Sequence, residues 1–94
     1  MGTLHRISDS ATIDRVVVLA ALLRLRARPG DQPAAPAKVR QVPFAGHRFT
    51  SDADVLAVQT ANPLLIALVG GSLRLTPEGL RQARERPNPR YGVQ

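Results

Sequence analysis

The sequence predicts a mainly α-helical fold with a small β element. Two segments, residues 11–28 and 52–61, repeat apolar residues at helical spacing. A third segment, residues 72–76, alternates apolar and polar residues as a half-buried strand does. Shorter helical signals between and after these segments bring the expected number of helices to between three and five.

Length and composition restrict the class of protein. A chain of 94 residues forms one domain. We assign residues 10–86 to it, residues 1–9 to an N-terminal arm and residues 87–94 to a flexible C-terminal tail. The absence of cysteine excludes disulfides, Cys-ligated zinc and a thiol nucleophile. The longest apolar run, residues 16–23, is too short to cross a bilayer, and no signal-peptide pattern precedes it. We therefore expect a cytoplasmic protein with no membrane partner.

The first helix is predicted over residues 11–28. Pro29 and Gly30 are expected to end it, because proline and glycine interrupt or cap helices. Several residues before or at its start can accept an otherwise unpaired backbone N–H: Ser8, Asp9, Ser10 and Thr12. The helix is predicted to follow directly after the N-terminal arm.

This helix is apolar on two sides. One stripe, expected to face the core, contains Ile13, Val16, Val17, Ala20, Leu23 and Ala27. A second stripe, on the opposite side, contains Val18, Leu22 and Leu25. Because a surface helix needs only one apolar face, we expect a second copy of the chain to cover the second stripe. That predicts a homodimer with Val18, Leu22 and Leu25 at its interface. The alternative is that the arm and the tail cover this side.

The sequence does not determine the secondary structure of the whole next segment, residues 29–44. Residues 29–37 are rich in proline and alanine and are expected to form a loop. Residues 35–42 fit a short helix ended by Pro43, whereas residues 39–44 fit a strand followed by a turn at residues 45–47. The apolar pattern does not distinguish the two.

The helix over residues 52–61 has a clearer start. Ser51 and Asp54 have the spacing of a capping box, in which the hydroxyl and the acid each satisfy a backbone N–H. Residues expected to face inward are Val55, Leu56, Val58 and Ala61. Asn62 and Pro63 are then expected to start a short apolar helical segment, residues 64–69, which Gly70 and Gly71 end.

The chain closes with a strand and a helix. The strand at residues 72–76 is expected to direct Leu73 and Leu75 inward and Arg74 outward. Thr76 caps the last helix, with Pro77 at its first position. Its inward residues are Leu80 and Ala83, its outward residues are Arg81, Arg84 and Arg86, and it ends at Pro87 and Pro89.

These elements resemble a known family. The apolar residues Leu65, Leu68 and Val69 precede two glycines, and the segment Leu-Thr-Pro-Glu-Gly follows at residues 75–79. Over about residues 11–86 the chain resembles the winged helix-turn-helix domains of bacterial and archaeal transcription regulators. The resemblance implies a winged-helix-like fold that binds double-stranded DNA. The family's wing has two strands, and here only residues 72–76 fit one, so the wing is truncated or is built from residues 39–49.

The charge supplies candidate contacts to DNA. The chain has 13 Lys and Arg against 7 Asp and Glu, a formal net charge of +6, which favours a polyanionic partner. Arg40, Arg48 and Arg74 are the candidates for phosphate contacts. Gln59 has the donor and acceptor pair that reads base edges, as do Gln41 and Asn62. His47, between Phe44 and Phe49, is a candidate for stacking or phosphate contact; the alternative is a turn between two core anchors.

No constellation of residues predicts catalysis. His5, Ser8 and Asp9 lie too close together, on the arm, to form a positioned triad. We predict no metal, no cofactor and no small-molecule ligand. The sequence therefore predicts a small basic DNA-binding protein, a homodimeric transcriptional regulator. The alternative is a protein–protein interaction or assembly module on the same fold that does not read DNA. It is motivated by apolar residues 64–69 and by the acids Asp52 and Asp54 at the start of a helix whose only outward polar residues are Gln59 and Thr60.

Overall fold

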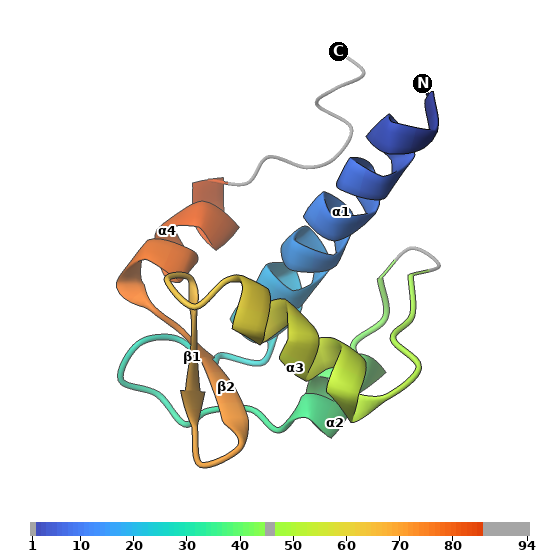
Figure 1. Cartoon of the computed structure of the whole chain (residues 1–94). Coiled ribbons are helices and arrows are strands. Elements are labelled where there is room, and N and C mark those ends of the chain that lie inside the picture. Colours follow the sequence, from blue (N-terminus) through green and yellow to red (C-terminus); the bar gives the residue numbers. More distant parts are fainter. Residues whose placement is uncertain (1, 45–46, 86–94) are drawn as a thin grey trace.

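Four helices and one antiparallel hairpin make up the fold (Figure 1). The computed structural model describes residues 2–44 and 47–85, and for residues 2–10 it describes the backbone alone. The elements follow in the order α1 (Gly2–Arg24), α2 (Pro36–Gln41), α3 (Asp52–Ala61), β1 (Ile66–Val69), β2 (Ser72–Leu75) and α4 (Pro77–Glu85). The predicted C-terminal tail lies outside the described residues. The expectation of a mainly helical fold with a small β element is confirmed.

Helix α1 differs from the prediction at both ends. It begins at Gly2, so the segment predicted as an arm is helical from its second residue. It ends at Arg24, before Pro29, because the next residues close it: Ala27 N–H donates to the Leu22 carbonyl at 2.9 Å and Arg26 N–H to the Leu23 carbonyl at 3.1 Å. These two bonds form a Schellman motif around Arg26, whose φ of 61° is left-handed.

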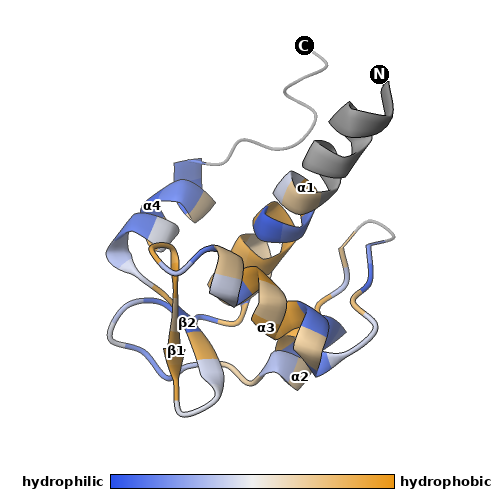
Figure 2. Cartoon of the chain, viewed as in Figure 1, coloured by the Kyte–Doolittle hydropathy of each residue, from blue (hydrophilic) through white to orange (hydrophobic). Residues whose placement is uncertain are grey.

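Both apolar stripes of α1 are covered within one chain, except at Ile13, which was expected to face the core and is 49 % exposed. Val18 and Leu22 are 0 % exposed, and Leu25 is half-buried against the core. Helix α1 contacts α2, α3, β2 and α4, so these elements surround its C-terminal half (Figure 2). The predicted dimer interface is therefore wrong: Val18 and Leu22 have no surface left for a second copy.

The ambiguous middle segment is helical. Helix α2 ends at Gln41 with Val42 as its C-cap, so the two-stranded element is not built from residues 39–49. Before it, Ala34 forms an isolated bridge with Leu73 of β2. Val39 points inward from α2 and is 2 % exposed.

Helix α3 confirms the predicted capping. The Ser51 hydroxyl accepts from Asp54 N–H at 3.3 Å, while the Asp54 carboxylate accepts from the N–H and the hydroxyl of Thr50. Val55 and Val58 are buried as expected, but Ala61 is exposed. Asn62 caps the end of α3 and does not start a new helix.

Residues 64–69 were predicted as a helical segment, and this is wrong, because β1 occupies residues 66–69. A short, wholly apolar run has no periodicity that separates strand from helix. Here the turn decides: Gly70 and Gly71 have φ of 58° and 83°, as a two-residue type I′ hairpin requires. Val69 thereby pairs with Ser72, and the register places Leu68 opposite Leu73.

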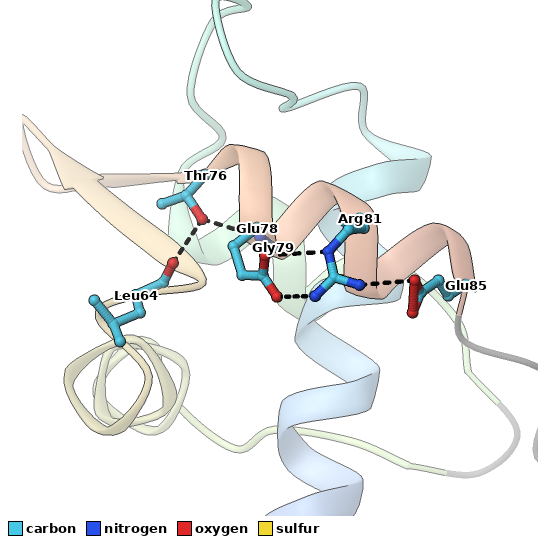
Figure 3. A network of polar contacts seen from close by, with 6 residues as sticks. All are labelled: Leu64, Thr76, Glu78, Gly79, Arg81 and Glu85. Carbon is cyan, nitrogen blue, oxygen red and sulfur yellow. Dashed lines mark hydrogen bonds and ion pairs between the residues drawn. The ribbon is translucent and has the colours of Figure 1, made fainter.

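Strand β2 and the start of helix α4 match the prediction, whereas the predicted end of this helix lies outside the described residues. Leu73 and Leu75 are at most 1 % exposed. The Thr76 hydroxyl accepts from Gly79 N–H at 3.0 Å and donates to the Leu64 carbonyl at 2.7 Å, which ties α4 to the start of the hairpin (Figure 3). A Cβ at Gly79 would overlap the Leu65 carbonyl oxygen, so the backbones of α4 and residue 65 approach too closely for any other residue type.

Candidate nucleic-acid interface

Several cations gather at the surface around helix α2 and the connection that follows it. Two adjoining depressions, of about 560 and 320 Å³, share Gln41, Val42 and Pro43. The described residues that line them include four cations and no acid. We call these cations, Arg24, Lys38, Arg40 and Arg48, the basic face.

Arg40 holds the basic face to α3. Its guanidinium donates to the Asp52 carboxylate at 2.8 Å and, at 3.4 Å, to the Thr50 carbonyl. Since this side chain is 35 % exposed and that of Asp52 is 53 % exposed, the pair is solvated and contributes at most about 1 kcal/mol. Arg40 thus reaches the surface with part of its charge compensated. For Arg24, Lys38 and Arg48, no ion pair occurs within the described part of the chain.

His47 anchors the connection between α2 and α3. Its Nε2 lies 2.7 Å from an Asp14 carboxylate oxygen of α1, and its ring packs against Phe49 with centroids 4.7 Å apart. Its Nδ1 is buried and finds no hydrogen-bond partner among residues 2–44 and 47–85. With Phe49 itself 9 % exposed, the arrangement fits a turn held between core anchors. The imidazole is held by these contacts and also lines the larger of the two depressions of the basic face.

Arg48 also borders a third depression, of about 580 Å³, between the middle of α1 and α3. This one adds Arg15 but also brings in Asp14 and Asp54. The Thr50 hydroxyl holds the pKa of Asp54 below its usual value, so this carboxylate remains charged at neutral pH. The mixed charge here contrasts with the α2 side, where the charged residues of the described lining are all cations.

Two of the predicted DNA contacts serve the fold instead. Arg74 of β2 is half-buried and donates to the Asp31 carbonyl at 3.2 Å. The Gln59 amide donates to the Ile66 carbonyl at 3.0 Å and so joins α3 to β1. Neither residue lines the basic face. Of the predicted phosphate contacts, the structure brings Arg40 and Arg48 together and places Arg74 elsewhere.

The exposed surface of α3 offers little to a polyanion. It carries Asp52, Ala53, Asp54, Ala57, Thr60 and Ala61, among which there is no cation. Sequence reasoning missed Lys38 and Arg24, since Arg24 fits a solvated helix end and Lys38 borders a loop. Lys38 could have been predicted from its spacing to Gln41, because the two residues share one face if residues 35–42 are helical.

Comparison with known protein families, curated proteins and solved structures found no match to this chain. None of the helices that the structure describes is both long and apolar enough to cross a membrane. Within the same residues, no group of three or more His, Asp or Glu is arranged to hold a metal ion.

Proposed function

We propose that the chain binds the phosphate backbone of double-stranded DNA through the basic face. The observation that carries the proposal is the gathering of Arg24, Lys38, Arg40 and Arg48 along α2, in two adjoining depressions lined by no described acid. Each phosphate neutralised by such a cation releases counterions, and this drives association without any base contact.

The order of the elements supports a role in transcription regulation. A first helix, a bridging residue, two further helices and a hairpin succeed one another as in winged helix-turn-helix domains. One feature departs from that family: residues 42–51 connect α2 and α3, whereas a helix-turn-helix uses a turn of roughly 3–4 residues. A recognition helix enters the major groove with its N-terminal residues at the base edges, and here those residues include Asp52 and Asp54. We therefore propose backbone binding by α2 and its connection, with little base reading by α3.

Fluorescence anisotropy with a labelled mixed-sequence duplex, repeated across a salt series, tests the proposal. Affinity should fall steeply with salt. The double variant Lys38→Ala/Arg48→Ala removes two cations and should reduce the slope of log K against log salt by about 2, since each phosphate contact contributes roughly 0.9.

Arg84→Ala is the matched control, because Arg84 is an exposed arginine on α4 outside the basic face. Its slope should equal that of the unmodified chain. The absence of binding at low salt would overturn the proposal. It would also be overturned if Arg84→Ala reduced the salt slope as much as a single substitution in the basic face does.

A second candidate function, the assembly module, rests on a different observation. Leu64, Leu68 and Val69 are 81 %, 52 % and 38 % exposed. Exposed apolar residues gathered around one hairpin mark a surface for another protein. A chain that ignores DNA yet self-associates or captures a partner would have this function.

A further inference from the structure

The outer edge of β1 presents one free backbone donor and one free acceptor. Leu73 N–H donates to the Ala34 carbonyl at 2.8 Å, and the Leu73 carbonyl accepts from Ala34 N–H at 2.7 Å. In an antiparallel pair, opposite residues exchange both bonds or neither. Leu68, opposite Leu73, therefore directs its N–H and C=O away from β2, to the open edge.

The rest of this edge is already satisfied within the chain. Ile66 N–H donates to the Asn62 carbonyl at 3.0 Å, and the Ile66 carbonyl accepts from Gln59 at 3.0 Å. The strand thus exposes the backbone of a single residue. We call this feature, Leu68 with its exposed neighbour Val69, the open edge.

The open edge lies in the longest part of the sequence without charge. No Asp, Glu, Lys or Arg occurs between Asp54 and Arg74. Edge strands are commonly protected from pairing by lysine, proline or a bulge, and residues 66–69 have none of the three. On a chain of net charge +6, two copies that meet through β1 bring together strands that carry no cation.

We infer that the open edge binds a second copy of the chain, with β1 antiparallel to its counterpart about a two-fold axis at Leu68. In each copy the Leu68 N–H then donates to the Leu68 carbonyl of the other copy, so both groups are satisfied and the pairing closes at two chains. The exposed Leu68 and Val69 side chains become covered.

Sedimentation measured up to about 1 mM chain tests the association. The mass should rise with concentration from the 10.1 kDa of one chain to twice that value. Added salt should leave the dimer unchanged or strengthen it, because salt screens the repulsion between the two positive chains. This sign is opposite to that expected for DNA binding, so failure of one proposal is distinguishable from failure of the other.

Two variants at Leu68 separate the edge from other surfaces. Leu68→Lys places a cation on the two-fold axis, and Leu68→Pro removes only an N–H that faces outward, which an edge strand tolerates. Both should stay monomeric with a melting temperature within a few degrees of the unmodified chain. Ile13→Lys makes the same change at an exposed apolar residue of α1 and should still dimerise.

Cross-linking tests the register directly. The chain has no cysteine, so Leu68→Cys introduces a unique thiol. Two such residues in a hydrogen-bonded antiparallel pair have Cα atoms about 5.5 Å apart, within reach of a short bis-maleimide. A covalent dimer should form with Leu68→Cys and not with Ile13→Cys. The inference is overturned by a monomer at all concentrations, by a dimer that both Leu68 variants retain, or by equal cross-linking at the two positions.

Discussion

The two ends of α3 border surfaces of opposite character. At its N-terminal end, Arg40 joins Asp52 to α2, and the basic face lies alongside. At its C-terminal end, Gln59 joins α3 to β1, where Leu64, Leu68 and Val69 expose apolar side chains. The hairpin and α2 accordingly lie at different ends of this helix in Figure 1. The net charge alone does not reveal this division, because it depends on which segments the fold places beside α3.

The comparison assigns different partners to the two ends. The basic face suits a polyanion, and the open edge suits an uncharged protein surface. If both proposals hold, a dimer about Leu68 leaves the basic face of each copy free, since the two surfaces share no residue. Changes that damage one end should therefore leave the binding function of the other measurable, provided the chain stays folded.

The largest change in stability is expected from Gly79→Ala, which disturbs the contact between α4 and the hairpin. A Cβ there meets the backbone of Leu65, and no rotamer change relieves that overlap. Separating α4 from the hairpin should lower the free energy of unfolding by about 3 kcal/mol or more, as measured by urea denaturation. Gln82→Ala, on the same helix, should change it by less than about 0.5 kcal/mol. A Gly79→Ala chain as stable as the unmodified one would show that this approach is not a constraint.

The next largest change in stability is expected from His47→Ala, near the N-terminal end of α3. This change removes the Phe49 packing and the 2.7 Å contact with Asp14, and should cost about 1–2 kcal/mol. Because the connection that carries Arg48 loses its anchor, DNA affinity should fall while dimerisation through the open edge remains. Arg48→Ala, an exposed side chain, should lower affinity with unchanged stability. Equal stability losses for the two variants would contradict the anchoring role.

The sequence predicts those parts of the fold that local chemistry specifies. The Ser51 and Asp54 capping box, the Thr76 cap and the alternating Leu73 and Leu75 all appear in the structure as expected. Residues 66–69 did not, because a short apolar run acquires its strand conformation from the Gly70 and Gly71 turn and from pairing with β2. Helix α1 illustrates the same limit: its second apolar stripe is real, but tertiary packing within one chain covers it.

The candidate site was predictable only in part. Arg40 and Arg48 lie on the basic face, but Arg74 and Gln59 are used in hydrogen bonds to backbone carbonyls that are distant in sequence or belong to another element. Which polar side chains remain free for a ligand depends on such tertiary partners, and a single sequence does not give them. The open edge is a still stronger case, since it is defined by the direction of Leu73 backbone bonds to Ala34.

A smaller effect, of opposite sign, is expected from Arg26→Gly. Arg26 closes α1 with a φ of 61°, a conformation that costs a non-glycine residue about 1 kcal/mol. Glycine should therefore raise the free energy of unfolding by roughly 0.5–1 kcal/mol. Arg26 does not line the basic face, so the salt slope of DNA binding should stay the same. A reduced slope would extend the basic face beyond the end of α1, to Arg26.

The smallest expected effect is a loss of stability at acidic pH, to which Asp54 at the N-terminal end of α3 contributes. The Thr50 hydroxyl lowers the pKa of Asp54, and the ion pair with Arg81 lowers that of Glu78. Both carboxylates bind protons more weakly in the folded chain than in the unfolded one. Their contribution to stability is thus present above the unfolded pKa, about 4, and is lost as the pH falls through the lowered folded value. The melting temperature should decline over that acidic range.

Asp54→Asn should reduce this decline without abolishing it, because Glu78 still titrates. The matched control is Asp31→Asn, which removes an acid paired with Arg28 on the surface. Asparagine at position 54 keeps an oxygen that can accept from Thr50. Asp54→Asn and the unmodified chain should therefore converge in stability once the Asp54 carboxylate is protonated. Parallel pH profiles for Asp54→Asn and the unmodified chain would remove Asp54 from the acid response and leave the charge of Glu78 as its source.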